Sequence, residues 1–157
     1  MFDRIKRIWW NIHLDMLGIK HGKLFSHIPP TYIYAKTGTI KFGDNLSLNH
    51  NVTIDANDGG SIIIGNNVAI GMNTVIRATN HNIYDHSKHT AGKIIIEDNV
   101  WIGANCVILP DVTIGSGSVI GAGSIVPKDI PKNVVAVGNP CKPIKDIVHE
   151  KEPDIEI

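Results

Sequence analysis

The sequence predicts an all-β protein built as a parallel β-helix, in which short strands wind into stacked coils. The first observation is a six-residue repeat: from Ile96 onward an aliphatic residue recurs at every sixth position as far as Val126. An α-helix would repeat every 3.6 residues, and hairpin strands would alternate without a turn at a fixed interval. The second observation is that the same phase occurs upstream, in the sets Phe42, Leu48 and Ile54, and Ile64, Ile70 and Ile76. With three strands to a coil, the repeat predicts about four coils, each burying its apolar face against its neighbours.

Each repeat unit is expected to be a short strand followed by a tight turn. A second small or apolar residue lies two positions before the repeating one, so two side chains point inward and the one between them points outward. These second residues are Ile94, Val100, Cys106, Val112, Ser118 and Ser124. A glycine often follows the strand, at Gly43, Gly65, Gly71, Gly103, Gly115 and Gly121. We expect this glycine to adopt the positive φ of a tight turn.

Residues 1–35 form an N-terminal segment before the repeat, with a helical stretch expected over 1–17. The apolar residues at helical spacing are Ile5, Ile8, Trp9 and Ile12, and the basic residues among them are Arg4, Lys6 and Arg7. Packing against the first coil is the simpler interpretation, and a peripheral membrane contact is the alternative for a basic amphipathic helix. Charged or polar residues interrupt every apolar run here, unlike in a signal peptide or membrane span. We therefore expect a cytoplasmic protein.

Two insertions interrupt the repeat. Four extra residues separate Ile54 from Ile64, around the turn-forming letters NDGG. Fourteen extra residues separate Ile76 from Ile96, and the loop over 79–92 contains three histidines, His81, His86 and His89. A long polar excursion from a regular coil is not needed by the core, so this loop is the first candidate for function.

The remaining chain is expected to close the coil. We predict one domain over 1–157, with the β-helix over 36–130 and a C-terminal cap and tail over 131–157. A short helix is expected from about Ile144 to Glu150.

Composition excludes several classes of function. Lysine plus arginine and aspartate plus glutamate both number 15, so no overall field attracts nucleic acid. Cys106 and Cys141 are too far apart for a paired-cysteine metal site or a disulfide framework, which fits a reducing compartment. The phase of Cys106 points it into the core, where cysteine acts as a small hydrophobic residue rather than a nucleophile.

Several outward positions are also apolar. Trp101 lies one residue before Ile102 and therefore points away from the core, where a tryptophan needs a ligand or a neighbour. The other outward apolar residues are Val75, Ile95, Val107, Val119 and Ile125. This is more apolar surface than a monomer normally exposes, which predicts a homo-oligomer.

The run IIIEDNVWIGANCVILPDVTIGSGSVIGAGSIVPKDIPKNVVAVGNPCKPIKDI resembles the left-handed β-helix acyltransferases of the hexapeptide-repeat family. The likeness is closest to the maltose and galactoside O-acetyltransferases and the polysaccharide O-acetyltransferases, and it covers roughly residues 40–147. Its most specific parts are NVWIG, IGAGSIV and VGNPCKPIK taken together. The resemblance implies a left-handed coil, acetyl-CoA as co-substrate, no metal, a sugar or saccharide acceptor, and a homotrimer with active sites between subunits.

The same resemblance implies roles for individual residues. His81 matches the family's general base, and an imidazole with its usual pKa of about 6.5 is largely neutral at pH 7. Asn51 matches an asparagine beside the acceptor. On the acetyl-CoA side the matching residues are Trp101, Gly103, Ala104, Ala122, Lys128, Lys142 and Lys145. Gly103 and Ala104 form a turn whose backbone N–H is expected to meet the oxyanion of the tetrahedral intermediate. Lysine at 142 and 145 replaces the common arginine, which keeps the charge but loses the bidentate fork.

Alternative functions remain at this point. An amine acceptor on an amino sugar would make the protein an N-acetyltransferase with the same base and donor. A zinc hydro-lyase like the gamma-type carbonic anhydrases would use His81 and His86, with His50 as a third ligand. A non-catalytic solenoid would bind partners through its flat faces. Two of the candidate residues also have purely structural alternatives. His81 could be a solvated loop residue, and Asn51 could be a turn asparagine hydrogen-bonded to its own backbone.

Overall fold

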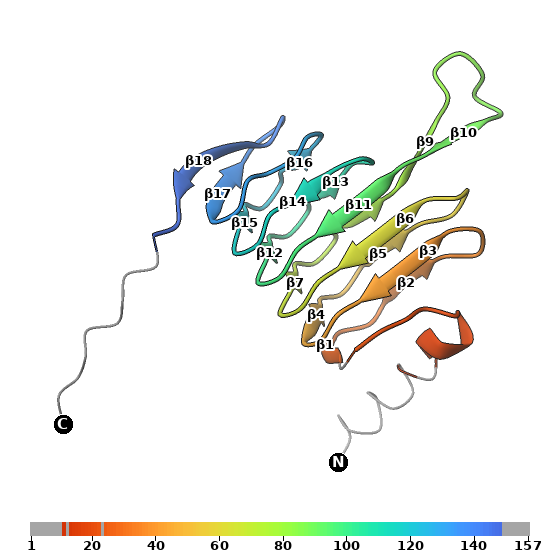
Figure 1. Cartoon of the computed structure of the whole chain (residues 1–157), viewed down its shortest axis with the longest axis horizontal. Coiled ribbons are helices and arrows are strands. Elements are labelled where there is room, and N and C mark those ends of the chain that lie inside the picture. Colours follow the sequence, from red (N-terminus) through yellow and green to blue (C-terminus); the bar gives the residue numbers. More distant parts are fainter. Residues whose placement is uncertain (1–10, 12, 23, 149–157) are drawn as a thin grey trace.

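The computed structural model describes residues 11, 13–22 and 24–148, and it consists almost entirely of strands stacked in coils (Figure 1). Three sheets of parallel strands run along the stack, and we name them A, B and C in the order in which each complete coil from β3 (Thr39–Phe42) onward passes through them. Neighbouring parallel strands lie about 4.8 Å apart, so each coil adds that height to the stack.

The strands of each sheet succeed one another from coil to coil. Sheet A contains β3 (Thr39–Phe42), β6 (Ser61–Ile64), β11 (Lys93–Ile96) and β14 (Thr113–Ile114). Sheet B contains β1 (Leu24–His27), β4 (Leu46–Leu48), β7 (Ala69–Ile70), β12 (Trp101–Ile102), β15 (Val119–Ile120), β17 (Val134–Val137) and β18 (Lys142–Asp146). Sheet C contains β2 (Thr31–Tyr34), β5 (Val52–Asp55), β8 (Val75–Arg77), β13 (Val107–Ile108) and β16 (Ile125–Val126).

The prediction of about four coils is confirmed. Four complete turns through sheets A, B and C are formed by β3–β5, β6–β8, β11–β13 and β14–β16. Parallel pairing also continues beyond them, because β1 and β2 pair with β4 and β5, and β17 pairs with β15.

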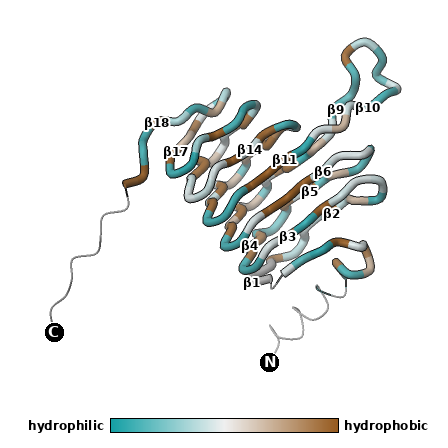
Figure 2. Tube along the Cα trace, viewed as in Figure 1, coloured by the Kyte–Doolittle hydropathy of each residue, from teal (hydrophilic) through white to brown (hydrophobic). Residues whose placement is uncertain are grey.

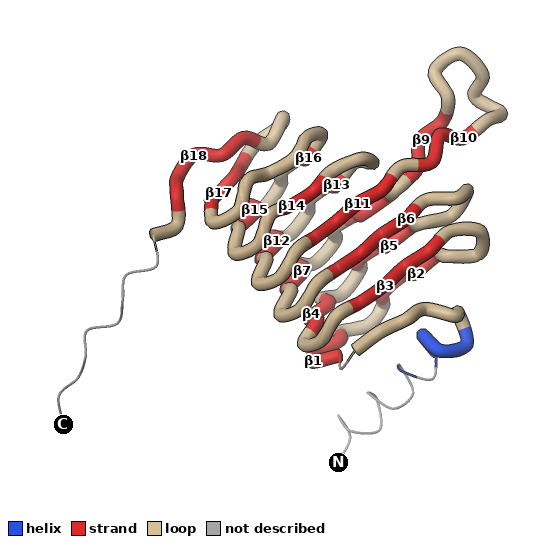
Figure 3. Tube along the Cα trace, viewed as in Figure 1, coloured by secondary structure: helices blue, strands red, loops and turns tan. Residues whose placement is uncertain are grey.

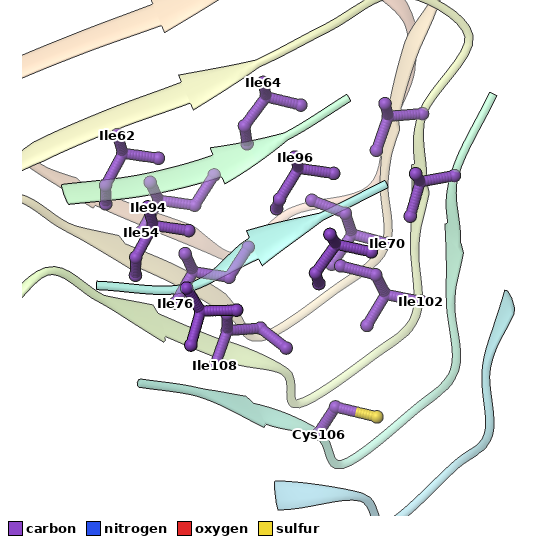
Figure 4. Packing of buried hydrophobic residues seen from close by; sticks show 14 of the residues in the cluster. Ile54, Ile62, Ile64, Ile70, Ile76, Ile94, Ile96, Ile102, Cys106 and Ile108 are labelled. Atoms are coloured by element: carbon purple, nitrogen blue, oxygen red, sulfur yellow. The ribbon is translucent and has the colours of Figure 1, made fainter. Parts of the chain in front are cut away.

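The six-residue repeat forms the core. Register places Ile54, Ile76, Ile108 and Val126 above one another in sheet C, and all four are fully buried. Cys106 lies among the buried isoleucines, as its phase predicts, and burial raises the pKa of its thiol (Figure 4). In Figure 2 the brown of hydrophobic residues lies mainly on the strands, and the loop between β9 (Thr79–His81) and β10 (His89–Ala91) is mostly hydrophilic.

The role expected for the turn glycines is wrong. Neither Gly71 nor Gly103 has a positive φ, but a Cβ on either would lie 2.6 Å from the backbone nitrogen of Ala104 or Ala122 in the next coil. Glycine is needed there because the backbones of successive coils approach closely. The left-handed conformation falls two residues after these positions, on Gly117 and Gly123 in the last complete coil and on asparagines in the earlier ones. The asparagines form two ladders: Asn45, Asn67 and Asn99 at one corner, and Asn51, Asn73 and Asn105 at another. Asparagine tolerates this conformation better than most residues.

The C-terminal helix is also not found. Residues 142–146 form β18, which pairs antiparallel with β17 and places Lys145 opposite Val135 (Figure 3). Without β18, β17 would end sheet B as an open edge with unpaired backbone groups, and the antiparallel strand satisfies them. The last two residues of the expected helix, 149 and 150, lie outside the described residues.

Little of the predicted N-terminal helix can be compared with the structure. Residues 11 and 13–16 are helical, and Leu14 is buried with the core. Most of the expected stretch, including Ile5, Ile8, Trp9 and Ile12, lies outside the described residues. Over residues 11, 13–22 and 24–148, no helix has the length and apolar character needed to cross a membrane.

Candidate active site

The fourteen-residue excursion forms an antiparallel hairpin that projects from the stack between sheets C and A (Figure 1). Its strands are β9 (Thr79–His81) and β10 (His89–Ala91). The loop between them is internally bonded: Asn82 Oδ1 accepts hydrogen bonds from the backbone N–H groups of Tyr84 and Asp85, at 2.8 and 3.1 Å.

Asp85 closes the tip of the hairpin. Its carboxylate accepts hydrogen bonds from the hydroxyl and backbone N–H of Ser87, at 2.6 and 3.1 Å, and lies 3.0 Å from the Lys88 ammonium. These interactions, that of the Ser87 hydroxyl first, hold the pKa of Asp85 below its usual value. The loop therefore has a defined shape although it is exposed.

His81 is the last residue of β9, and one of its two ring nitrogens takes part in a hydrogen bond. Its Nδ1 lies 2.9 Å from the backbone oxygen of His86. A carbonyl oxygen can only accept, so Nδ1 must carry the hydrogen, and in the neutral ring Nε2 keeps the lone pair. This is the tautomer that can take a proton from a substrate through Nε2.

A second histidine contacts His81. The register of the hairpin pairs His81 with His89, and their ring centroids are 4.5 Å apart. Nδ1 of His89 lies 3.7 Å from Oδ2 of Asp58 in the NDGG bulge. The bulge also packs against the base of the hairpin, since a Cβ on Gly60 would lie 2.9 Å from that of Ala78.

Asn51 lies at a different corner from His81. It precedes β5 at the corner between sheets B and C, has a φ of 57°, and donates through Nδ2 to Asn73 Oδ1 at 3.1 Å. His81 lies beyond the opposite end of sheet C, because it follows β8, which runs parallel to β5. A single chain therefore does not bring Asn51 and His81 together, and Asn51 belongs to an asparagine ladder.

Four of the residues expected on the acetyl-CoA side line one groove. Trp101, Gly103, Ala104 and Ala122 face a space of about 340 Å³ at the corner between sheets B and C. The indole of Trp101 is exposed and forms an apolar wall. Gly71, Met72 and Asn49 also line the groove and were not expected from the sequence.

Only one of the two expected oxyanion donors is free in this turn. The N–H of Gly103 donates to the backbone oxygen of Ile120 at 2.8 Å and is therefore occupied. The N–H of Ala104 makes no hydrogen bond within the described part of the chain. Ala104 is thus the better donor for a developing oxyanion.

Two of the three lysines share sheet B with the groove. Trp101, Val119, Val135 and Lys145 are register partners on successive strands, which places Lys145 about 14 Å from Trp101 at three strand spacings. Lys142 is on the same strand as Lys145, opposite Val137. Lys128 follows β16 at the corner between sheets C and A, so this chain alone does not place it beside the groove. None of the three forms an ion pair with a described residue, which leaves their charges available to an anion.

Asp58 and His89 were not singled out as site residues from the sequence. A signal was present, because both insertions follow a sheet C strand and therefore interrupt the same corner in adjacent coils. Adjacent insertions at one corner must stack, which predicts contact between the NDGG bulge and the hairpin.

The histidines do not gather as a metal site within one chain. His50 lies beside Asn51, at the opposite end of sheet C from His81 and His86. Among residues 11, 13–22 and 24–148, no three or more His, Cys, Asp or Glu side chains are placed to hold a metal ion.

Comparison with known proteins gives consistent similarities. Residues 93–128 match the family model described as "Bacterial transferase hexapeptide (six repeats)". The galactoside O-acetyltransferase of Escherichia coli K12 is 46% identical over 123 residues, covering 76% of this chain and 59% of that protein. The galactoside O-acetyltransferase of Lactococcus lactis is 43% identical over 130 residues, covering 76% of this chain and 62% of that protein. This chain thus spans about three fifths of the length of these curated relatives.

Two solved structures have the same fold and contain the co-substrate or its product. A hexapeptide-repeat acetyltransferase from Vibrio cholerae, complexed with acetyl-CoA, superimposes with a TM-score of 0.77 at 31% identity, covering 88% of this chain and 76% of that one. A galactoside acetyltransferase in complex with coenzyme A superimposes with a TM-score of 0.71 at 38% identity, covering 88% of this chain and 72% of that one.

Proposed function

The chain belongs to the hexapeptide-repeat acetyltransferases, and on that basis we propose that it transfers an acetyl group from acetyl-CoA to a hydroxyl group of a sugar or saccharide. The observation that carries this proposal is the hydrogen bond from His81 Nδ1 to the His86 carbonyl, which leaves Nε2 as a base. The two galactoside O-acetyltransferases among the relatives support a sugar acceptor.

The proposed reaction is a direct transfer within a ternary complex. Nε2 of His81 takes the proton of the acceptor hydroxyl as its oxygen attacks the thioester carbonyl carbon. The N–H of Ala104 donates to the oxyanion of the tetrahedral intermediate. The C–S bond then breaks, and the proton on His81 passes to the leaving thiolate of coenzyme A. The base is neutral again at the end of the cycle.

The donor is proposed to lie along sheet B. The pantetheine arm occupies the groove beside Trp101, where Gly103, Ala104 and Ala122 leave room for it. Lys142 and Lys145 lie further along the same sheet and meet the phosphate groups of the nucleotide. Lysine supplies charge without fixing geometry, so these contacts depend strongly on salt.

A homotrimer with active sites between subunits is part of the proposal. The groove and Asn51 lie at one end of sheet C and His81 at the other, so one chain does not form a complete site. The outward row Val75, Val107 and Ile125 on sheet C supplies apolar surface for an interface. Sedimentation equilibrium tests this: a monomeric mass at micromolar concentration would contradict it.

The coil is proposed to be left-handed, as the resemblance to the family implies. A cytoplasmic location fits a supply of acetyl-CoA.

The first test is calorimetric titration of acetyl-CoA, and separately coenzyme A, into metal-stripped protein. We expect about one site per chain and weaker binding when Lys142 and Lys145 are changed to alanine. The acceptor is then screened with sugars and amino sugars, since an amine product would indicate an N-acetyltransferase. Absence of coenzyme binding by folded protein, together with stoichiometric zinc, would favour the hydro-lyase instead.

Catalysis is tested with His81→Ala, which should lower turnover by about two to four orders of magnitude. A folded His81→Ala protein that transfers acetyl groups at the original rate would remove His81 as the base. Coenzyme binding with no transfer to any acceptor would favour a non-catalytic solenoid.

A further inference from the structure

The loop histidine that contacts His81 has no role in the reaction as described so far. We propose that His89 is a positioning residue: its ring, anchored by Asp58, holds the His81 imidazole in the orientation that presents Nε2 to the acceptor. This inference rests on the proposed function of His81 as the base.

The first argument is that the hydrogen bond to His86 is not sufficient. His81 is exposed, and a single hydrogen bond in contact with water contributes little net free energy. That bond fixes one ring atom and leaves the imidazole free to swing about it. A base held this loosely spends much of its time pointing away from the reacting hydroxyl.

The second argument is that the contact with His89 follows from the hairpin register. His81 and His89 are direct partners across β9 and β10, so their side chains emerge on the same face about 5 Å apart. The ring centroids are separated by 4.5 Å with an interplanar angle of 43°. The flat face of one ring therefore limits the rotation of the other.

The third argument is that His89 is anchored from outside the hairpin. Its Nδ1 lies 3.7 Å from Asp58 Oδ2, which is too far for a direct hydrogen bond, so the two side chains attract each other as an ion pair when the His89 ring is protonated. Asp58 in turn donates its backbone N–H to the Thr37 hydroxyl at 2.7 Å. Asn57 accepts a hydrogen bond from the Lys36 backbone at 2.9 Å. The orientation of His81 is thus tied, through His89 and Asp58, to the turn between β2 and β3.

A matched control exists in the same loop. The side chain of Tyr84 is exposed and makes no ring contact or side-chain hydrogen bond within the described part of the chain. Tyr84→Ala therefore removes an aromatic ring from the same loop without removing the proposed support. The substitution Asp58→Asn removes the charge of the anchor and introduces a residue type that tolerates the φ of 58° found there.

The kinetic test compares His89→Ala, His89→Phe, Asp58→Asn and Tyr84→Ala in the whole chain. We expect kcat to fall about tenfold in His89→Ala, with the KM values for acceptor and acetyl-CoA changed by less than about twofold. His89→Phe should recover most of kcat because it keeps a ring, Asp58→Asn should lose about threefold, and Tyr84→Ala should be unaffected. A kcat for His89→Ala within twofold of the Tyr84→Ala control would overturn the proposal.

A second outcome would also overturn it. If His89→Phe were as inactive as His81→Ala, His89 would itself transfer the proton and would not be a positioning residue.

Imidazole ¹⁵N spectra of histidine-labelled protein provide a readout that needs no turnover. We expect His81 to be a single Nδ1–H tautomer in the original protein and in Tyr84→Ala, and a mixture of tautomers in His89→Ala. An unchanged single tautomer in His89→Ala would refute the positioning role. If His81→Ala retained full activity, the proposed role of His81 as the base would fail, and these spectra would still decide whether His89 orders His81.

Discussion

Gly43→Ala tests whether the turn glycines are required by the close approach of successive coils. A Cβ at Gly43 would lie 2.7 Å from the carbonyl carbon and oxygen of Gly65, in the corresponding turn of the next coil. An ordinary contact of this kind starts at 3.4 Å, so the two backbones would have to separate by about 0.7 Å. Strand spacing in the sheets is set by hydrogen bonds at about 4.8 Å, and the coils cannot separate by this amount without lengthening them.

Overpacking of this kind costs about 1–3 kcal/mol. For a chain of 157 residues, each kcal/mol lowers Tm by about 2–4 °C, so we expect a decrease of about 2–12 °C. The measurement is thermal unfolding by circular dichroism at one fixed protein concentration, because an oligomer's Tm depends on concentration.

Position 45 separates the two explanations for the turn. Asn45 has a φ of 55°, so Asn45→Ala should lose about 1–2 kcal/mol of folding free energy through backbone strain. Asn45→Gly should lose less, since glycine adopts that conformation freely. A Gly43→Ala protein with an unchanged Tm would refute the close-approach explanation.

Three further predictions follow from the groove, the hairpin and the core. Trp101→Ala should weaken acetyl-CoA binding about tenfold, measured by calorimetry, because it removes the apolar wall of the groove; unchanged affinity would place the donor elsewhere. The lowered pKa of Asp85 means that its contacts contribute stability above its usual value of 3.8 and are lost as pH falls through the lower pKa of the folded chain. Protection of the Ser87 amide, measured as the ratio of its intrinsic to its observed exchange rate, should fall in that acid range, and Asp85→Asn should show low protection at every pH; the same pH dependence of protection in the two proteins would refute this. Burial raises the pKa of the thiols of Cys106 and Cys141, so both cysteines should react with a thiol reagent at pH 8 only after the protein unfolds. Rapid labelling of the native protein would contradict this prediction.

The repeat made most of the fold predictable from the sequence. The inward phase of Ile54, Ile76 and Ile108 is confirmed, because burial alternates with a period of two in the strands that contain them and the chain turns at a fixed interval. The C-terminal helix was wrong because the pattern around Ile144 contained no information about the open edge of β17. The turn glycines were misinterpreted because steric crowding between coils acts across residues that are far apart in the sequence.

The candidate site was predictable only in part. Trp101, Gly103, Ala104 and Ala122 do line one groove, and His81 does occupy the hairpin, although their catalytic and binding roles stay predictions. The separation of Asn51 from His81 along sheet C, and the occupied N–H of Gly103, could not be derived from motif matches. A motif match identifies candidate residues but does not indicate at which corner of the coil each of them lies.

By itself, the sequence determined the period of the coil, the residues that face its core and the two places where the chain leaves it. These features depend on the alternation of apolar and polar residues and on turn-forming residues, and both can be recognised from residues that are adjacent in the sequence. Only the tertiary structure decided which nitrogen of His81 is free, that Asp58 supports the hairpin through His89, and that β18 closes sheet B. Each of those depends on a contact between separate segments, at distances of a few ångströms that the stacking of coils establishes.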